Sequence, residues 1–244
     1  MKSKAILAGI ILLVISFLGL QYFPSGEDTI KVASFNAQIF GDTKISKIGV
    51  DYYKDLIEDY DLFFLLEIRD IDESSFQQVC DSLTNYNCLI SNRSGRSTSK
   101  EQIGVFYKNE SLNIIEFKSL TDNEDKFERE PVFLKLDNGL IFHIVHLKPT
   151  NVSQELTALE ELVTTGVLIG DFNADCDYYN NEEEIHLDSW NWIIKDDADT
   201  TTTKTDCAYD RIIVSNSIEV SDFGIVEIDE DVSDHKLIWA EITG

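Results

Sequence analysis

Positive charge is scarce in this chain. Its 244 residues contain 20 lysines and arginines against 45 aspartates and glutamates, which gives a net charge of −25 at pH 7 and a pI near 4.3. This charge opposes long-range attraction of a polyanion, so nucleic-acid binding would have to rely on a locally positive cleft. The surface is typical of a soluble, secreted or salt-tolerant protein. Internal repeats and low-complexity tracts are also absent, apart from the Thr200–Thr203 run, which excludes a repeat architecture.

The N-terminus carries an export signal. Met1–Lys4 is a positive n-region and Ala5–Leu20 is apolar, which at 16 residues is long for a signal peptide and short for a membrane span. No good small-x-small cleavage site precedes Pro24. Residues 1–26 are therefore predicted to be a signal peptide or an N-terminal membrane anchor. Residues 27–244, within a chain of 43% apolar residues, are long enough for one domain with an ample core, facing an oxidising exterior.

Cysteine is equally sparse. The chain has four cysteines, and this number fits an oxidising compartment. Three pairings are open from the residues alone. The four are Cys80, Cys88, Cys176 and Cys207.

Apolar periodicity predicts many strands and fewer helices. Ser46–Asp59 and Ser153–Val163 are expected to be helical, as is the segment to about Leu83 that begins with Ser74 and Gln77 in capping-box spacing. Ile185–Ile194 is expected to be partly helical. Strands among helices favour an α/β (α+β) fold of two stacked sheets flanked by helices. The predicted strands are Ile30–Asn36, Leu62–Leu66, Cys88–Ser91, Ile103–Tyr107, Leu112–Phe117, Val132–Leu136, Leu140–Leu147, Val167–Ile169, Ile212–Ser215, Phe223–Ile228 and Lys236–Ile242.

Six short segments place a carboxylate, an amide or an imidazole at or just after the end of a strand-like run. Side chains at strand ends can converge on one point while the sheet fixes their positions. A set of Asn, Glu, Asp and two His is what a hard divalent cation and a proton-shuttling pair need to cleave a phosphate ester. The segments are Ser34–Asn36, Leu66–Asp70, Val145–Pro149, Gly170–Asp175, Ala208–Arg211 and Ser233–His235.

In this order and at these spacings the segments resemble the endonuclease/exonuclease/phosphatase superfamily, and within it the deoxyribonuclease I branch. The Gly-Asp-Phe-Asn of Gly170–Asn173 is common to the superfamily, while Gly170–Cys176 followed by Thr205–Ile212 is more particular to that branch. The similarity runs from about Ile30 to the C-terminus. It implies a four-layer α/β/β/α sandwich of two packed mixed sheets flanked by helices, with the catalytic face at one edge of the sheets.

The resemblance also implies a Cys176–Cys207 disulfide, because both cysteines flank matched motifs. Cys80 and Cys88 then pair by elimination, without support from the family. Two buried free thiols are the alternative for this second pair.

Two imidazoles are implied to carry the proton transfers. In-line phosphodiester cleavage needs a base to activate water and an acid for the leaving 3′-oxygen, and histidine serves both near neutral pH. By resemblance, Glu101 pairs with His146 and Asp210 pairs with His235, while the assignment of base and acid stays open. Abasic-site endonucleases of the superfamily typically lack the first histidine, so the His146–Glu101 pair favours a general nuclease.

Oxygen ligands predict a catalytic metal. Glu67 directly follows five apolar strand residues, where a carboxylate is costly without a partner, although the start of a solvated loop is the alternative. By resemblance, Asn36 supports the same cation or a phosphate oxygen, and Asp234 lies on the metal side. Asp171 and Asn173, in a turn after an apolar strand, suit binding of the scissile phosphate and the metal-bound water, with an Asx turn as the alternative. The implied ion is Mg²⁺, with Mn²⁺ as an alternative.

A threonine-rich run predicts a structural Ca²⁺. The family places one at a matching Asp-x-Thr-x-Thr-x-Thr run inside the loop closed by Cys176 and Cys207. In an extended segment, alternate residues offer oxygens on one side to a hard ion, whereas read alone the run is a strand edge or loop. A second calcium loop of the family, around Thr121–Glu130, is shortened here. The predicted calcium residues are Asp199, Thr201, Thr203 and Thr205.

Basic side chains near the motifs are the predicted substrate contacts. Gln38 stands where the family usually has an arginine, and Ser99 where it has a minor-groove tyrosine. The Asn92–Ser97 loop is expected to enter a minor groove as a basic finger, with a solvated hairpin tip as the alternative. His143 and His186 fall in no matched motif and are left out of the site. The predicted substrate-binding residues are Arg69, Arg96, Arg129 and Lys204.

These features predict a secreted or surface-anchored Mg²⁺/Ca²⁺-dependent endonuclease that hydrolyses DNA with little sequence specificity and leaves 5′-phosphate ends. The alternative is a phosphodiesterase of the same superfamily acting on RNA, nucleotides or a phospholipid head group, which the acidic surface favours. A third hypothesis, an inactive binding or adhesion protein, is opposed by the complete set of motifs. DNA is the expected partner, with the membrane as a further one through the N-terminal segment. No protein partner follows from the sequence.

Overall fold

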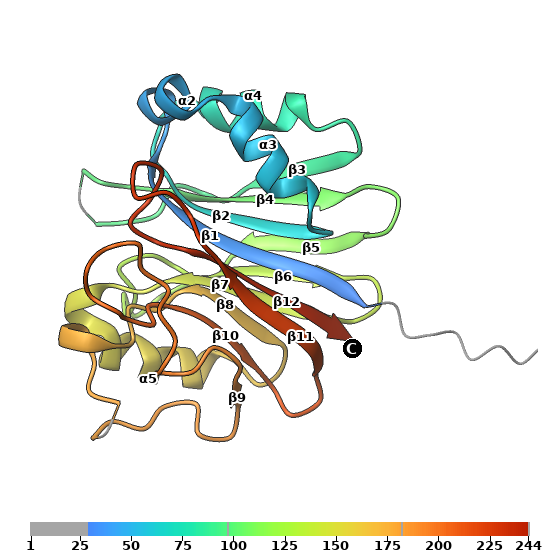
Figure 1. Ribbon diagram of the computed structural model, residues 1–244. Helices are drawn as coiled ribbons and strands as arrows, with labels where there is room; N and C mark the ends of the chain where they lie inside the picture. The colour runs from blue at the N-terminus through green and yellow to red at the C-terminus, as the bar shows by residue number, and fades with distance from the viewer. Residues whose placement is uncertain (1–28, 97, 182, 244) are drawn as a thin grey trace, which may run out of the picture.

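The computed structural model describes residues 29–96, 98–181 and 183–243, which form two six-stranded sheets packed face to face (Figure 1). In each sheet one pair of neighbours is parallel, β1 with β2 and β7 with β8, and the others are antiparallel. The first sheet has the order β11 (Glu219–Val226), β12 (Leu237–Thr243), β1 (Ile30–Phe40), β2 (Leu62–Ile68), β4 (Gln102–Lys108), β3 (Tyr86–Ile90). The second has the order β5 (Ile114–Ser119), β6 (Val132–Leu136), β7 (Ile141–His146), β8 (Val167–Asp171), β10 (Asp210–Val214), β9 (Asn191–Trp192).

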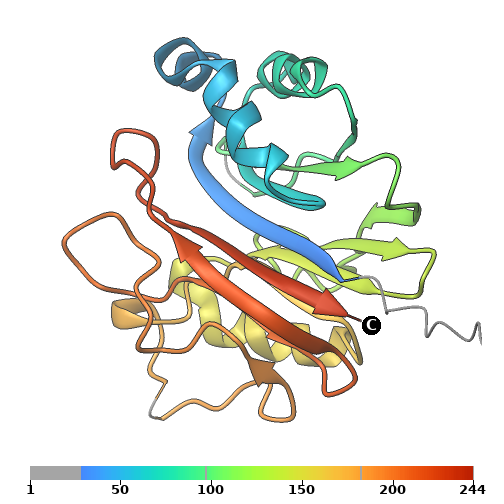
Figure 2. The same ribbon diagram turned by 45° about the vertical axis from the view of Figure 1, so that its right-hand side comes forward.

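Helices cover the outer faces of both sheets (Figures 1 and 2). The first sheet carries α2 (Asp42–Ile48), α3 (Val50–Glu58) and α4 (Ser74–Ser82). The second carries α5 (Val152–Leu162), preceded by the 3₁₀ turn η1 (Pro149–Asn151), and a second 3₁₀ turn, η2 (Cys176–Tyr178), follows β8. The predicted α/β/β/α sandwich is therefore confirmed.

Three apolar layers hold the sandwich together. In β2, Phe64 packs in the layer between the two sheets, whereas Phe63 and Leu65 pack against the helices. A third layer lies between α5 and the second sheet. A central strand that is buried on both faces needs apolar residues at every position, which explains the unbroken Leu62–Leu66 run. Each such fully buried side chain contributes about 1.5–3 kcal/mol.

Two sequence predictions of local structure are wrong. Ile185–Ile194 contains no helix, because Trp192 pairs with Ile213 as the short strand β9. The capping box at Ser74 does not form; Glu73 is the N-cap residue with φ 60°, and the Ser74 hydroxyl donates to Asp42 at 3.0 Å. In addition, the helix expected over Ser46–Asp59 is divided at Gly49, where φ is 94°.

Both disulfides form. Cys80–Cys88 ties the end of α4 to β3, and Cys176–Cys207 closes a 31-residue separation next to the motif segments. The Cys176–Cys207 pairing that the resemblance implies is confirmed, and so is the remaining pair, so the alternative of two free thiols is wrong.

The Cys80–Cys88 bridge gives a stability prediction. Replacing both cysteines with serine should lower the free energy of unfolding by roughly 2–3 kcal/mol, because the eight-residue separation closes a short loop in the unfolded chain. Urea denaturation of the double variant measures the loss. An unchanged free energy of unfolding in the double variant would contradict this prediction.

The predicted leader, residues 1–26, lies outside the described residues. Among the residues that the structure describes, no helix combines the length and the apolar character needed to cross a bilayer.

Candidate active site

The motif residues meet at one edge of the two sheets. Asn36, Glu67, His146 and Asp171 lie in the last part of β1, β2, β7 and β8, respectively. Glu101, Asp210 and His235 lie at or just before the starts of β4, β10 and β12. Because these three strands run antiparallel to their neighbours, their starts meet the ends of the others. In both ribbon views the loop before β12 and the loop between β9 and β10 lie at the end of the molecule opposite the C-terminus (Figures 1 and 2).

Asp171 occupies the centre of this edge and is 1% exposed. Asn36 Nδ2 donates to its Oδ2 at 3.0 Å. The same oxygen lies 3.4 Å from Nε2 of His146 and 3.6 Å from Nε2 of His235. One carboxylate oxygen thus faces an amide and both imidazoles.

Each imidazole has its own carboxylate on the other ring nitrogen. His146 Nδ1 makes a close hydrogen bond with Glu101, and His235 Nδ1 lies 2.8 Å from Asp210 Oδ2. All four side chains are at least 88% buried. Carboxylates on Nδ1 fix the ring orientation and leave Nε2 of both rings directed at Asp171.

Charge pairing sets the protonation of this cluster. Burial lowers the pKa of His146, but the carboxylates of Glu101 and Asp171 outweigh it and raise the pKa above its ordinary value. For His235, burial likewise opposes the charged ring, but Asp210 and Asp171 outweigh it and raise the pKa to about 10. Burial raises the pKa of Glu101, but His146, Arg129 and Arg69 together lower it more, and the net pKa lies below the ordinary value.

Glu67 lies beside this cluster at an irregular point of β2. Its φ is 62°, and the pairing of β2 with β4 shifts register between Leu65 and Ile68. Asn36 Nδ2 lies 3.4 Å from its Oε1, and the Ile39 backbone N–H donates to its Oε2 at 2.9 Å. This bulge turns the carboxylate away from the apolar core toward the edge. The alternative of a solvated loop is therefore wrong.

The donor set fits a hard divalent cation. The ligand atoms of Glu67, Glu101 and His146 lie within 4.8 Å of one another. The same holds for Asp171, Asp210 and His235. Asp234 adds a buried Oδ1 that has no hydrogen-bond partner among the described residues and lies 3.7 Å from His235 Nε2. A buried carboxylate oxygen without a partner is costly unless a cation approaches it.

Asn173 lies under the centre of the site and is 5% exposed. Its backbone N–H donates to Asp171 Oδ1 at 3.0 Å, and its Nδ2 donates to the carbonyl of Leu147 at 3.0 Å. Its φ of 50° is a left-handed conformation that asparagine tolerates better than most residues. Asn173 therefore orients the central aspartate and the chain that follows His146.

The predicted substrate cations separate into two groups. Arg129 Nε lies 2.9 Å from Glu101, and Arg69 lies 2.8 Å from Glu67, so both guanidiniums are at the site. Arg96 instead donates to Asp125 at 3.0 Å and to the carbonyl of Phe127 at 2.9 Å. Lys204 is exposed on the loop between β9 and β10. The structure thus gathers the first two and not Arg96.

Aromatic residues beside His235 were missed from the sequence. The Tyr209 ring lies 6.5 Å from the His235 ring and stacks on Tyr178 at 5.4 Å. Tyr209 stands inside the matched Ala208–Arg211 segment, and this position was the available signal. Lys44 faces Asp234 and Glu67, and burial lowers its pKa more than these two carboxylates raise it; no sequence motif pointed to this lysine.

The four predicted calcium residues lie together but already pair internally. Asp199 Oδ2 accepts from Lys236 Nζ at 2.7 Å, and its Oδ1 accepts from the Thr201 N–H at 3.0 Å. The Thr203 and Thr205 hydroxyls lie 3.2 Å apart. A lysine ammonium on the only carboxylate of the run does not fit a calcium site.

His143 and His186 lie outside the site, as expected. His143 is buried in β7 with its ring against Phe133, and burial lowers its pKa to about 4. His186 pairs with Glu160 at 3.2 Å. Packing explains the first and an ion pair the second.

His143 predicts a pH dependence of stability. The unfolded ring titrates near pH 6.5, so between about pH 6.5 and 4 only the unfolded chain binds the proton. The contribution is complete above pH 6.5 and is lost as the pH falls through 4, roughly 3 kcal/mol in total. Urea denaturation at pH 7 and pH 5 should show a smaller loss for His143→Gln than for the wild type. The control is His186→Gln, which should behave as the wild type; equal pH dependence of all three proteins would contradict the prediction.

Comparison with known proteins agrees with this geometry. Residues 33–235 match the Endonuclease/Exonuclease/phosphatase family, and the chain belongs to it. Within the family it belongs to the deoxyribonuclease I branch and is a deoxyribonuclease I-like phosphodiester hydrolase: it is 33% identical to deoxyribonuclease-1 of Gallus gallus over 221 residues, 78% of each chain.

Solved structures show the same fold. TDP2 of D. rerio, crystallised with a single-strand DNA product, has a TM-score of 0.66 at 13% identity, covering 89% of this chain and 100% of that one. A mannosyl-6-phosphatase of Bacteroides thetaiotaomicron has a TM-score of 0.62 at 16% identity, covering 88% of this chain and 100% of that one.

Proposed function

We propose that this nuclease is a divalent-metal-dependent endonuclease that hydrolyses DNA with little sequence preference and leaves 5′-phosphate ends. The proposal rests on the arrangement of the two imidazoles, which face the same carboxylate oxygen. Nε2 of His146 and Nε2 of His235 both lie within 3.6 Å of Asp171 Oδ2, and each ring has a carboxylate on Nδ1. Two opposed proton-transfer groups at one point are what in-line cleavage of a phosphodiester requires.

In the proposed mechanism the rings exchange protons only through Nε2. One ring accepts a proton from water as the new O–P bond forms, and the other ring protonates O3′ as the P–O3′ bond breaks. The products are a 3′-hydroxyl and a 5′-phosphate. Glu101 and Asp210 keep the Nδ1 protons in place and stabilise whichever ring is charged.

Asp171 and Asn173 hold the reacting groups in line. Asp171 orients the nucleophilic water between the rings, and Asn173 fixes the Asp171 carboxylate through its backbone N–H. Glu67, Asn36 and Asp234 would hold Mg²⁺, with Mn²⁺ as an alternative. When bound, this ion neutralises charge on the phosphate oxygens and the leaving group.

Basic side chains at the catalytic edge, and not the overall charge of the protein, are proposed to bind the substrate. Arg69 and Arg129 line the catalytic edge beside Glu101, in a protein whose net charge is −25. Lys204 adds an exposed cation on the loop between β9 and β10. Contacts to phosphates position a duplex without reading its sequence, which supports low sequence preference.

Plasmid nicking tests the proposal. The protein with Mg²⁺ should relax supercoiled plasmid, EDTA should stop the reaction, and excess Mg²⁺ should restore it. Asp171→Asn should be inactive although it is isosteric, whereas Asp137→Asn, in the exposed turn between β6 and β7, should retain activity. No nicking with any divalent ion at any ionic strength would refute the proposal.

A second candidate is a phosphodiesterase for RNA, nucleotides or a phospholipid head group. Two observations favour it: the strongly acidic surface, and the pairing of Arg96 with Asp125, which removes one predicted DNA contact. Turnover of DNA, RNA and sphingomyelin by one preparation distinguishes the two functions. Faster cleavage of either non-DNA substrate would favour the second.

Export is proposed from the leader and the cysteines. Both disulfides form, and residues 1–26 have the composition of a signal peptide or anchor. The domain, residues 27–244, would act outside the cell or on the outer face of the membrane. Two measurements on the expressed full-length protein test this: the identity of its N-terminal residue, and whether it is recovered in the medium or in the membrane fraction. An intact N-terminus with all protein in the cytoplasm would refute it.

A further inference from the structure

The loop between Asp199 and Thr205 is paired with a lysine from outside it, Lys236. Lys236 Nζ lies 2.7 Å from Asp199 Oδ2 and 3.0 Å from Glu227 Oε1. Lys236 is only 8% exposed, and Asp199 is the less exposed of its two partners, with 29% of its side chain accessible against 81% for Glu227. The pair of Lys236 with Asp199 is therefore largely shielded from solvent, unlike the exposed pair of Lys47 with Asp231.

The surrounding oxygens are engaged with one another. Thr201 Oγ1 lies 2.9 Å from Asp199 Oδ1 and also contacts the carbonyl of Thr205. Ca²⁺ needs six to eight oxygen ligands at about 2.3–2.6 Å, and it would have to displace these contacts beside an ammonium of the same charge sign. Lys236 thus does for Asp199 what a metal ion would otherwise do.

Backbone hydrogen bonds join the loop directly to Asp210 and to the two residues that flank His235. The Lys236 N–H donates to the carbonyl of Thr200 at 2.7 Å, and the Thr202 N–H donates to the carbonyl of Asp234 at 2.9 Å. The Asp210 N–H donates to Thr200 Oγ1 at 3.0 Å. Any change in the loop is therefore transmitted to the backbone of Asp210 and of the residues that flank His235.

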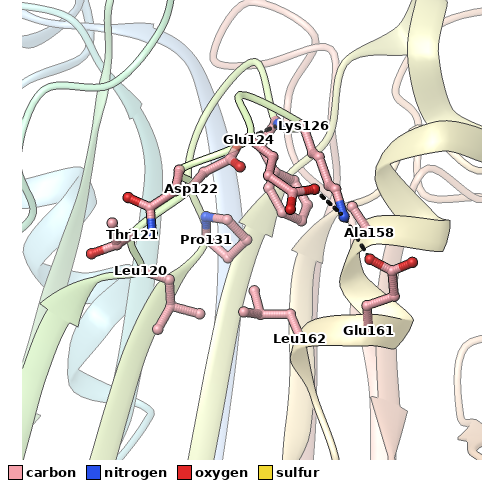
Figure 3. Close-up of a pocket in the computed structure, with 11 residues that line it drawn as sticks. Leu120, Thr121, Asp122, Glu124, Lys126, Pro131, Ala158, Glu161 and Leu162 are labelled. Atoms are coloured by element: carbon pink, nitrogen blue, oxygen red, sulfur yellow. Dashed lines mark hydrogen bonds and ion pairs between the residues drawn. The ribbon is translucent and has the colours of Figure 1, made fainter.

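A second acidic loop, residues 122–130, also pairs with cations of the chain, but these ion pairs are exposed. Arg96 donates to the Asp125 carboxylate and to the carbonyl of Phe127. Lys126 lies 2.9 Å from Glu124 and 2.6 Å from Glu161, and Figure 3 shows it between these carboxylates at a pocket of about 240 Å³. In exposure these pairs resemble that of Lys47 with Asp231 and differ from the pair of Lys236 with Asp199.

We propose that Lys236 takes the place of a structural divalent cation, so that the fold is independent of Ca²⁺, and that it is a positioning residue for the His235–Asp210 pair. Stability is the primary consequence and does not depend on the proposed nuclease activity. The effect on turnover rests on that activity.

Melting curves with Mg²⁺ held constant test the proposal, in Ca²⁺ and in a calcium chelator. A folded-state calcium site at hundredfold saturation would raise Tm by roughly 5–10 °C, and we expect no such rise for the wild type. Lys236→Gln should lower Tm and should gain a rise with Ca²⁺, because Asp199 and Glu227 are then left without a cation. Lys236→Arg should remain close to the wild type, and Lys47→Gln is the control for loss of an exposed lysine pair.

Turnover separates positioning from stability alone. At a temperature where it is folded, Lys236→Gln should lower kcat for DNA with little change in KM, and Lys236→Arg should restore kcat. A wild-type Tm that rises with Ca²⁺ and loses this response in Asp199→Asn would overturn the proposal. So would a Lys236→Gln protein with unchanged Tm and kcat. If Lys236→Gln does not fold, the wild-type and Asp199→Asn melting curves decide alone.

Discussion

Replacing His146 or His235 with alanine is expected to lower kcat for plasmid cleavage roughly 10²–10⁴-fold, the usual contribution of a general acid or base. Each ring faces Asp171 through Nε2 and is held by its own buried carboxylate, so each substitution removes a proton transfer and leaves the arginines in place. KM should therefore change little. Initial rates of plasmid nicking over a range of DNA concentrations measure both parameters.

The double variant provides a sharper test. Because the two rings act in one concerted displacement, losing both should cost far less than the product of the single losses. His143→Gln is the matched control, since that ring belongs to the same strand as His146 but packs on Phe133. Near-wild-type kcat in either single alanine variant would contradict the proposed roles.

Gly170→Ala is expected to lower the free energy of unfolding by roughly 3–5 kcal/mol. An alanine Cβ would lie 2.1 Å from the carbonyl oxygen of Val145, and φ at this residue is 137°. The Cβ would push β8 away from β7 just before Asp171, whose paired residue is His146. Any folded fraction should therefore also lose kcat. Urea denaturation and turnover of the soluble fraction measure the two effects.

Gly139→Ala is the control for backbone strain alone. Its φ is 98°, and a Cβ there meets no atom within 4 Å. Its cost should be limited to the strained conformation, roughly 1–2 kcal/mol, with kcat unchanged. Equal losses at the two positions would show that the close approach of β7 and β8 does not matter.

The pattern of apolar residues predicted most of the fold, because a strand that is buried on both faces is apolar at every position. Val132–Leu136 is a strand with the predicted bounds, and the Leu62–Leu66 run lies in a strand buried on both sides. The pattern was misleading at Ile185–Ile194, where a tertiary partner, Ile213, pairs with Trp192. Periodicity reports which face is apolar and not which neighbour a segment meets.

Site residues could be named from the sequence for a similar reason. Asn36, Glu67 and Asp171 lie in the last parts of strands that begin with apolar runs, and polar groups at strand ends converge when the strands share an edge. Arg96 shows the limit. It was expected at the substrate, but Asp125, 29 residues away, binds its guanidinium instead. Charge and motif spacing contain no information about such pairings.

The sequence by itself determined the sandwich class, the family, the histidine and carboxylate inventory and the cysteines, since these depend on residue type and on order along the chain. Only the tertiary structure decided that Asp171 faces both rings, that Glu67 reaches the edge through a bulge, and that Lys236 neutralises Asp199. Those facts depend on distances between segments far apart in the chain. Such distances result from the packing of the two sheets, to which every buried side chain contributes, and no local pattern encodes them.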